Sequence, residues 1–200
     1  MTAASSTERD VLQSSRLPDL IALANETSSE KRRLLLRELS DHFLGGIEHS
    51  AAETELYGSV LETLSEEMET AVRAELAARF ALAPNAPAGL IRRLAEDQIE
   101  VAGPVLRDST VLTDEDLIGV VSRQGQDHMR AVSGRTEVSE AVSDIIVERG
   151  DDQTLGVLLR NDGAQLSRSA SETAIERAKT NPALHAPAVE RKSQIGRAHV

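Results

Sequence analysis

The fold is decided by the stretch Leu106-Arg107-Asp108-Ser109-Thr110-Val111-Leu112-Thr113-Asp114-Glu115-Asp116-Leu117-Ile118. An apolar helix is expected to end at Arg107, and a second apolar helix is under way about ten residues later. Thr113 and Asp116, just before the second helix, have the hydroxyl-to-carboxylate spacing of an N-terminal capping box. The stretch therefore predicts two consecutive helices joined by a short turn.

The same pattern recurs at intervals along the chain. The first helices end at Arg79, Arg107, Arg135 and Arg160, and the matching second helices contain residues 89–91, 116–118, 144–146 and, more weakly, 169–171. The steps from one arginine to the next are 28, 28 and 25 residues. A fixed period of this size is typical of an α-solenoid, in which each helix pair buries its apolar face against neighbouring pairs. We therefore predict an all-α protein with a HEAT-like helical repeat of antiparallel helix pairs.

Further helices are predicted before this repeat. An apolar stripe from Leu34 to Phe43 has helical spacing, and Gly45-Gly46 is expected to end that helix because glycine readily adopts the left-handed cap conformation. Ser50 and Glu53 form a second capping signature. The expected organisation is a flexible N-terminus at 1–16, N-terminal helices at 17–70, helix-pair repeats at 71–191 and a tail at 192–200.

Composition excludes several kinds of chemistry. The 200 residues include 33 acidic and 22 basic side chains, for a net charge of −11, and no cysteine or tryptophan. Without cysteine there is no disulfide, thiolate zinc site, iron–sulfur cluster or cysteine nucleophile. Acidic charge and an aromatic content of 2% argue against nucleic-acid binding. The sequence lacks a secretory signal and an apolar run long enough for a bilayer, so we expect a cytoplasmic protein with no membrane partner.

The last six residues, Ile195 to Val200, can be encoded by ATC GGA AGA GCA CAC GTC, a string common in sequencing adapters. We interpret residues 195–200 as adapter read-through, so that the natural chain continues past about Gln194. A solenoid cut at this point leaves its last helix pair without the neighbour that should cover it. We therefore expect self-association through the uncovered C-terminal repeat.

Several blocks of sequence resemble one known family. Leu94–Leu106 followed by Val111–Ile118 is similar to the central signature of a bacterial family called domain of unknown function 2336, familiar chiefly from alphaproteobacteria. Residues 30–35, 72–77, 84–87, 147–151 and 161–164 also resemble its pattern. The resemblance runs from about Leu17 to about Arg191, and it implies a HEAT-like helical repeat with no established activity and no catalytic residues to transfer. Members usually continue with further repeats, which agrees with a truncated chain.

No residue pattern predicts catalysis or metal binding. His42 and His49 would share a face only on a helix running through Gly45-Gly46, so we expect two solvated histidines flanking a turn. Carboxylate pairs such as Asp114/Asp116 and Asp151/Asp152 are expected to cap helices. Nucleophile-elbow, phosphate-loop and calcium-loop motifs are missing from the sequence. We therefore assign no catalytic, cofactor-binding or metal-binding residue.

Arg79, Arg107 and Arg135 are the candidate partner-binding residues. In one interpretation each is a solvated cation at a helix C-terminus, where it is stabilised by the helix dipole. In the other, the aligned arginines line one surface of the superhelix and bind an acidic partner. The first interpretation is favoured because many carboxylates nearby can neutralise such a row.

Two functions from different classes are compatible with the sequence. The leading hypothesis is a non-enzymatic, cytoplasmic protein-interaction scaffold with an unknown protein partner, because solenoids present long concave surfaces. The alternative is an enzyme or small-molecule-binding protein that uses the concave groove of the helical repeat, an argument by fold analogy. A pocket with convergent polar groups would favour the alternative.

Overall fold

The structure is a computed structural model that describes residues 29–46, 48–66 and 68–189. These residues form ten α-helices and one 3-10 helix, with no β-strand among them, which confirms the all-α prediction. The helices are α3 (Ser29–Leu44), α4 (Ala51–Glu66), α5 (Thr70–Phe80), α6 (Ala88–Ala95), α7 (Ile99–Asp108), α8 (Asp114–Arg123), α9 (Gln126–Ser133), α10 (Glu140–Arg149), α11 (Asp152–Arg160), α12 (Arg168–Thr180) and η1 (Pro182–Leu184). The predictions for residues 1–16, for the beginning of 17–70, and for the 192–200 tail with its 195–200 hexapeptide fall outside the described residues.

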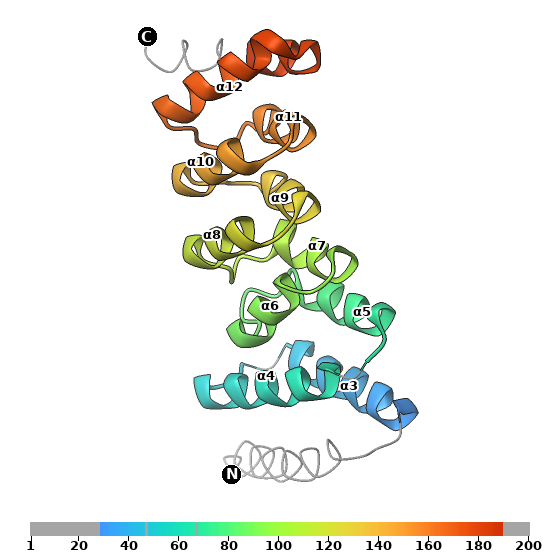
Figure 1. The fold of residues 1–200 in the computed structure, drawn as a ribbon. Coiled ribbons are helices and arrows are strands. Elements are labelled where there is room, and N and C mark those ends of the chain that lie inside the picture. Colours follow the sequence, from blue (N-terminus) through green and yellow to red (C-terminus); the bar gives the residue numbers. More distant parts are fainter. Residues whose placement is uncertain (1–28, 47, 67, 190–200) are drawn as a thin grey trace, which may run out of the picture.

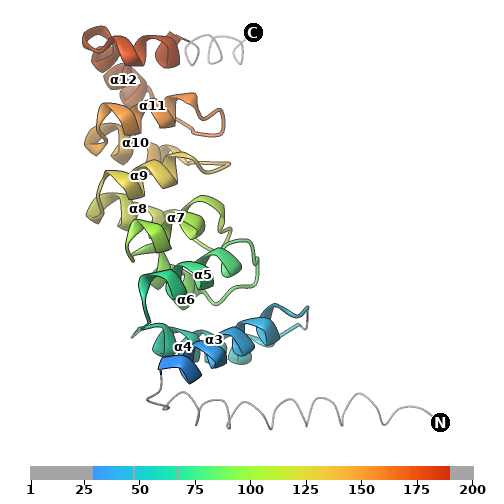
Figure 2. The same cartoon turned by 90° about the vertical axis from the view of Figure 1, so that its right-hand side faces the viewer.

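The helices are stacked in an elongated, two-row arrangement (Figures 1 and 2). One row contains α3, α5, α7, α9 and α11, and each of these helices contacts the next one in the row. The other row contains α4, α6, α8, α10 and α12, in which α4 contacts α6 and α10 contacts both α8 and α12. Helices that are two places apart in sequence are therefore neighbours within a row.

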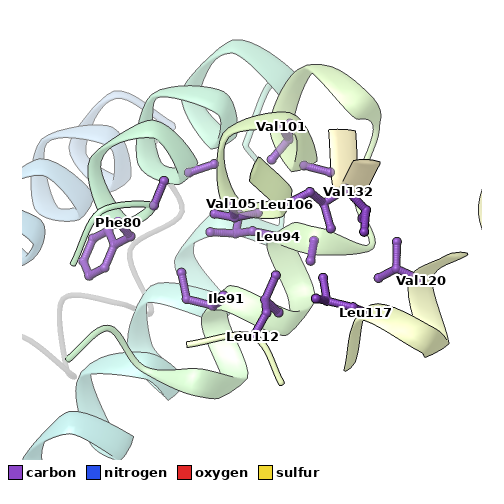
Figure 3. Close-up of a cluster of buried hydrophobic side chains, with 14 of the residues drawn as sticks. Phe80, Ile91, Leu94, Val101, Val105, Leu106, Leu112, Leu117, Val120 and Val132 are labelled. Atoms are coloured by element: carbon purple, nitrogen blue, oxygen red, sulfur yellow. The ribbon is translucent and has the colours of Figure 1, made fainter. Parts of the chain in front are cut away.

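The core runs between the two rows and is built almost entirely from aliphatic side chains. Figure 3 shows part of it, where Leu94 of α6 and Val105 of α7 lie among side chains from α5, α8 and α9. Ile91, Val101, Leu106, Val120 and Val132 are also buried. Such small and branched side chains suit close packing between short helices, because every helix buries a face against several neighbours.

The capping residues predicted before α4 and α8, and the glycine stop predicted after the first helix, are present in the structure. Thr113 Oγ1 accepts from the Asp116 backbone at 3.3 Å, and Asp116 Oδ2 accepts from the Thr113 backbone at 3.0 Å, which completes a capping box before α8. Ser50 and Glu53 make the same reciprocal pair before α4. Gly46 follows α3 with a φ of 82°, the left-handed conformation that glycine tolerates.

Hydrogen bonds join neighbouring helices of a row at similar sequence separations, between 26 and 30 residues. Gln124 Nε2 donates to Glu96 O at 3.2 Å, and Asn161 Nδ2 donates to Ser133 O at 2.8 Å. Arg149 Nη1 donates in the same way to Val121 O. Each of these pairs is 28 residues apart. These separations are close to the 25 to 28 residues between successive arginines of the predicted repeat.

One close contact links the loops after α9 and α11. Val138 N donates to Gly163 O at 3.1 Å, and Gln165 N donates to Val138 O at 2.8 Å, forming an isolated parallel β-bridge between Val138 and Ala164. A Cβ on Gly163 would lie 1.8 Å from Thr136 O. Only glycine fits at position 163, because any side chain there would collide with this carbonyl oxygen.

Candidate functional site

The three predicted arginines occupy different environments. Arg79 of α5 pairs with Asp41 of α3. Arg107 of α7 is exposed and forms no ion pair with the described residues. Arg135, which follows α9, is half-buried. All three lie at the ends of helices of the same row. Of the three, only Arg107 is both exposed and without an ion-pair partner among the described residues.

Arg135 binds backbone carbonyls of the preceding helix in its row. Its Nη1 donates to Leu106 O at 2.6 Å, and its Nη2 donates to Ser109 O at 2.8 Å. Burial lowers the pKa of Arg135 from its ordinary value, while the nearby carboxylates of Asp108 and Asp114 act in the opposite direction. A guanidinium remains charged in proteins, so Arg135 acts as a permanent cationic cap on the last carbonyls of α7.

A second series of arginines, in the other row, was missed by the sequence analysis. Arg93 pairs with Glu66 at 2.9 Å, and Arg123 pairs with Glu96 at 2.5 Å. Further along the row, Arg149 donates to Val121 O, and Arg177 donates to Val147 O at 3.1 Å and to Gly150 O at 2.9 Å.

The signal for this second series was present in the sequence. From Arg93 onward the steps to Arg123, Arg149 and Arg177 are 30, 26 and 28 residues, as regular as those of the first series. In each case the guanidinium reaches the C-terminal end of the helix before it in the row. Arg79, Arg135 and the second series therefore join neighbouring helices of a row. In the first series Arg107 forms no ion pair with the described residues, and Arg160 donates to Gly156 O of its own helix.

A groove on the described surface lies between α4 and α6. Its volume is about 660 Å³, and it is open to solvent. Its carboxylates all come from α4, and Arg92 of α6 lies at its edge. The lining residues are Ala51, Thr54, Glu55, Gly58, Ser59, Glu62, Thr63, Glu66, Ala86, Pro87, Ala88, Gly89 and Arg92.

A smaller groove of about 190 Å³ continues between α6 and α8. Arg92 lines it too, together with Glu96, Glu115 and Arg123. Because Arg92 borders both grooves, they are adjacent hollows on the surface of one row. The Arg123–Glu96 ion pair neutralises part of the second groove.

His42 and His49 are not the solvated pair that the sequence led us to expect. Both are half-buried in a cluster with Phe43, Tyr57 and Phe80, which are the only aromatic residues of the chain. The His49 ring stacks on Phe43 with centroids 4.9 Å apart, and Tyr57 Oη lies 2.5 Å from His42 Nδ1. The prediction was wrong because the turn at Gly45-Gly46 folds His49 back against α3 and α4.

The remaining polar groups form structural contacts. His128 is buried, and its Nε2 lies 2.8 Å from Asp97 O, which joins α9 to the turn before α7. No group of three or more histidine, aspartate or glutamate side chains in the described residues is arranged to hold a metal ion. None of the helices in the described part of the chain has the length and apolar character needed to cross a bilayer.

These observations define an all-helical protein whose short helices are stacked in two rows and joined by arginine-to-carbonyl and arginine-to-carboxylate contacts. Residues 101–194 match the model of a family described as "uncharacterised protein conserved in bacteria (DUF2336)". The match confirms the resemblance over these residues, which run from the beginning of α7 past the end of η1. For the blocks before residue 101 the resemblance stays a prediction. Comparison with curated proteins and with solved structures finds no match.

Proposed function

We propose that this chain is a HEAT-like α-solenoid that acts as a non-enzymatic, cytoplasmic protein-interaction scaffold. The observation that carries the proposal is the recurrence of side-chain hydrogen bonds to backbone carbonyls between successive helices of a row, at sequence separations of 26 to 30 residues. Such regular contacts leave the outer surfaces of consecutive helices side by side, as repeat proteins do when they bind an extended partner.

The row that contains α5, α7 and α9 carries the candidate face of Arg79, Arg107 and Arg135. Arg107 is the residue of this face best suited to contact a partner, because its guanidinium is exposed and unpaired among the described residues. Arg79 is already paired with Asp41, and Arg135 is held by two carbonyls. We therefore place the acidic group of the partner at Arg107, with the other two arginines shaping the surface beside it.

The test is capture of partners from native lysate by the immobilised chain. Arg107→Glu should reduce the recovery of specifically bound proteins at least fivefold, because it replaces an attractive contact with a repulsive one. Arg168→Glu is the matched control: it makes the same charge change at a residue whose side chain is 93% exposed. Equal recovery with the two variants would remove the arginine face from the proposal.

A second candidate function is a small-molecule binder or enzyme that uses a groove of the stack. The observation in its favour is the hollow between α4 and α6, whose volume of about 660 Å³ is within the range of ligand sites. Its open shape and its lining from two successive helices suit an extended ligand better than an enclosed substrate. We therefore keep the scaffold as the leading proposal.

A further inference from the structure

Two glycines that line the groove, Gly58 and Gly89, stand where α4 and α6 approach each other. A Cβ on Gly58 would lie 2.7 Å from Pro87 Cβ, so Pro87 packs directly against the α4 backbone. A Cβ on Gly89 would lie 2.7 Å from Glu62 Oε1, so the Glu62 carboxylate lies against the first turn of α6. The two contacts show that the helices lie at close range beside the groove.

The charge of the groove is one-sided. α4 contains four glutamates and no basic residue. Glu53 is used in the capping pair with Ser50, and Glu66 pairs with Arg93. Within the described residues Glu55 and Glu62 form no ion pair, and both line the groove. The groove thus holds two carboxylates available for a cation from outside.

The walls of the groove complement the rest of a basic side chain. Pro87, Ala86 and Ala88 provide an apolar wall beside the carboxylates. Lysine and arginine bury their aliphatic stems against apolar surface while the charged head stays polar. Thr54 and Ser59 add hydroxyl groups along the α4 edge, where they can bind peptide amides. An open hollow lined in this way suits an extended chain rather than a compact ligand.

We propose that the α4–α6 groove binds an extended polypeptide segment that places a lysine or arginine side chain between Glu55 and Glu62. Arg92, which has no ion-pair partner among the described residues, lines both this groove and the adjacent one, and it favours an acidic residue further along the same segment. This proposal rests on the proposed interaction role but uses a different row of helices from Arg107.

The experiment uses the full chain, labelled with 15N, and an end-blocked heptapeptide of alternating alanine and lysine. At low salt the peptide should shift the amide signals of α4 and α6 more than those of α10 and α12. A peptide with glutamine in place of lysine should bind at least tenfold more weakly, because it lacks the charge that the carboxylates attract.

Variants separate a defined site from general attraction to an acidic protein. Glu55→Gln combined with Glu62→Gln should weaken binding of the lysine peptide at least fivefold. The matched control, Glu140→Gln with Glu148→Gln, removes the same charge from exposed positions on α10 and should change binding less than twofold. Unfolding midpoints of both double variants establish that each is folded.

Three results would overturn the proposal: equal effects of the two double variants, signal changes spread over the whole stack, or spermidine binding the groove as tightly as the lysine peptide. The last result would assign the groove to small polycations. Because the Arg107 assay measures capture on the other row, it can fail while the groove binds peptide, and the reverse also holds. Failure of this proposal is therefore distinguishable from failure of the scaffold function.

Discussion

Arg135 Nη1 donates a hydrogen bond to the carbonyl oxygen of Leu106 across 2.6 Å. Arg135 follows α9 and Leu106 lies in the last turn of α7, so the bond joins successive helices of one row. A residue that the sequence suggests as a surface contact is thus half-buried between two helices. Arg135, Arg149 and Arg177 each reach the end of the preceding helix in the row, so their regular spacing agrees with the stacking of the helices.

Replacing Arg135 with methionine should destabilise the protein by about 2 kcal/mol, since a cation that binds two carbonyls is lost and Ser109 is buried. Urea unfolding followed by circular dichroism measures the change. Arg107→Met is the matched control, because Arg107 is exposed, and it should alter stability by less than about 0.5 kcal/mol. Similar losses in the two variants would contradict the structural role of Arg135.

Acid should weaken the contact between Arg73 and Asp97. Arg73 donates to both carboxylate oxygens of Asp97, at 2.6 and 3.0 Å, and these bonds hold the pKa of Asp97 below its ordinary value. Because the pKa is lower in the folded chain, the stabilisation is complete above the ordinary pKa of about 3.9 and is lost as pH falls through the folded value.

Asp97→Asn should therefore lower the urea midpoint most at neutral pH. The difference in midpoint between this variant and the unmutated chain should shrink below about pH 4. Unfolding curves at pH 7, 5, 3 and 2 provide the comparison. Glu100→Gln removes an exposed carboxylate, and its urea midpoint should match that of the unmutated chain at every pH. A difference for Asp97→Asn that stays constant down to pH 2 would rule out this linkage.

Two glycine-to-alanine changes should act in opposite directions. At Gly58 the new Cβ would meet Pro87 Cβ at 2.7 Å, and we expect a net loss of about 1 kcal/mol because the helices must move apart. At Gly103 the nearest atom is Arg107 Nη2 at 3.8 Å, so alanine fits and should stabilise α7 by about 0.5–1 kcal/mol. Thermal unfolding of both variants decides the matter, and stabilisation by Gly58→Ala would show that the α4–α6 contact is not tight.

Tyr57→Phe should cost about 1 kcal/mol, because the hydroxyl that lies 2.5 Å from His42 Nδ1 is removed from a residue that is only 1% exposed. A double-mutant cycle with His42→Leu measures the coupling, which should be of the same size. His185→Leu serves as the control and should show no coupling with Tyr57. Additive effects of Tyr57→Phe and His42→Leu would mean that their contact does not stabilise the protein.

The local part of the fold was predictable because it depends on neighbours in sequence. The capping pairs Ser50/Glu53 and Thr113/Asp116, and the stop at Gly45-Gly46, each involve residues at most three positions apart. The solvated histidines were mispredicted for the opposite reason. Tyr57, the partner of His42, is 15 residues away, and no local pattern marks the pair.

By itself the sequence determined the all-helical class, the positions of the main helix ends and a period of about 28 residues, because caps and apolar spacing act within one or two turns. Only the tertiary structure decided that Arg135 is held by α7 while Arg107 faces solvent. The tertiary structure also brings Pro87 against Gly58, and both residues line the groove that holds Glu55 and Glu62. Such differences arise between residues about one period apart, where the packing of whole helices sets which side chains find a partner.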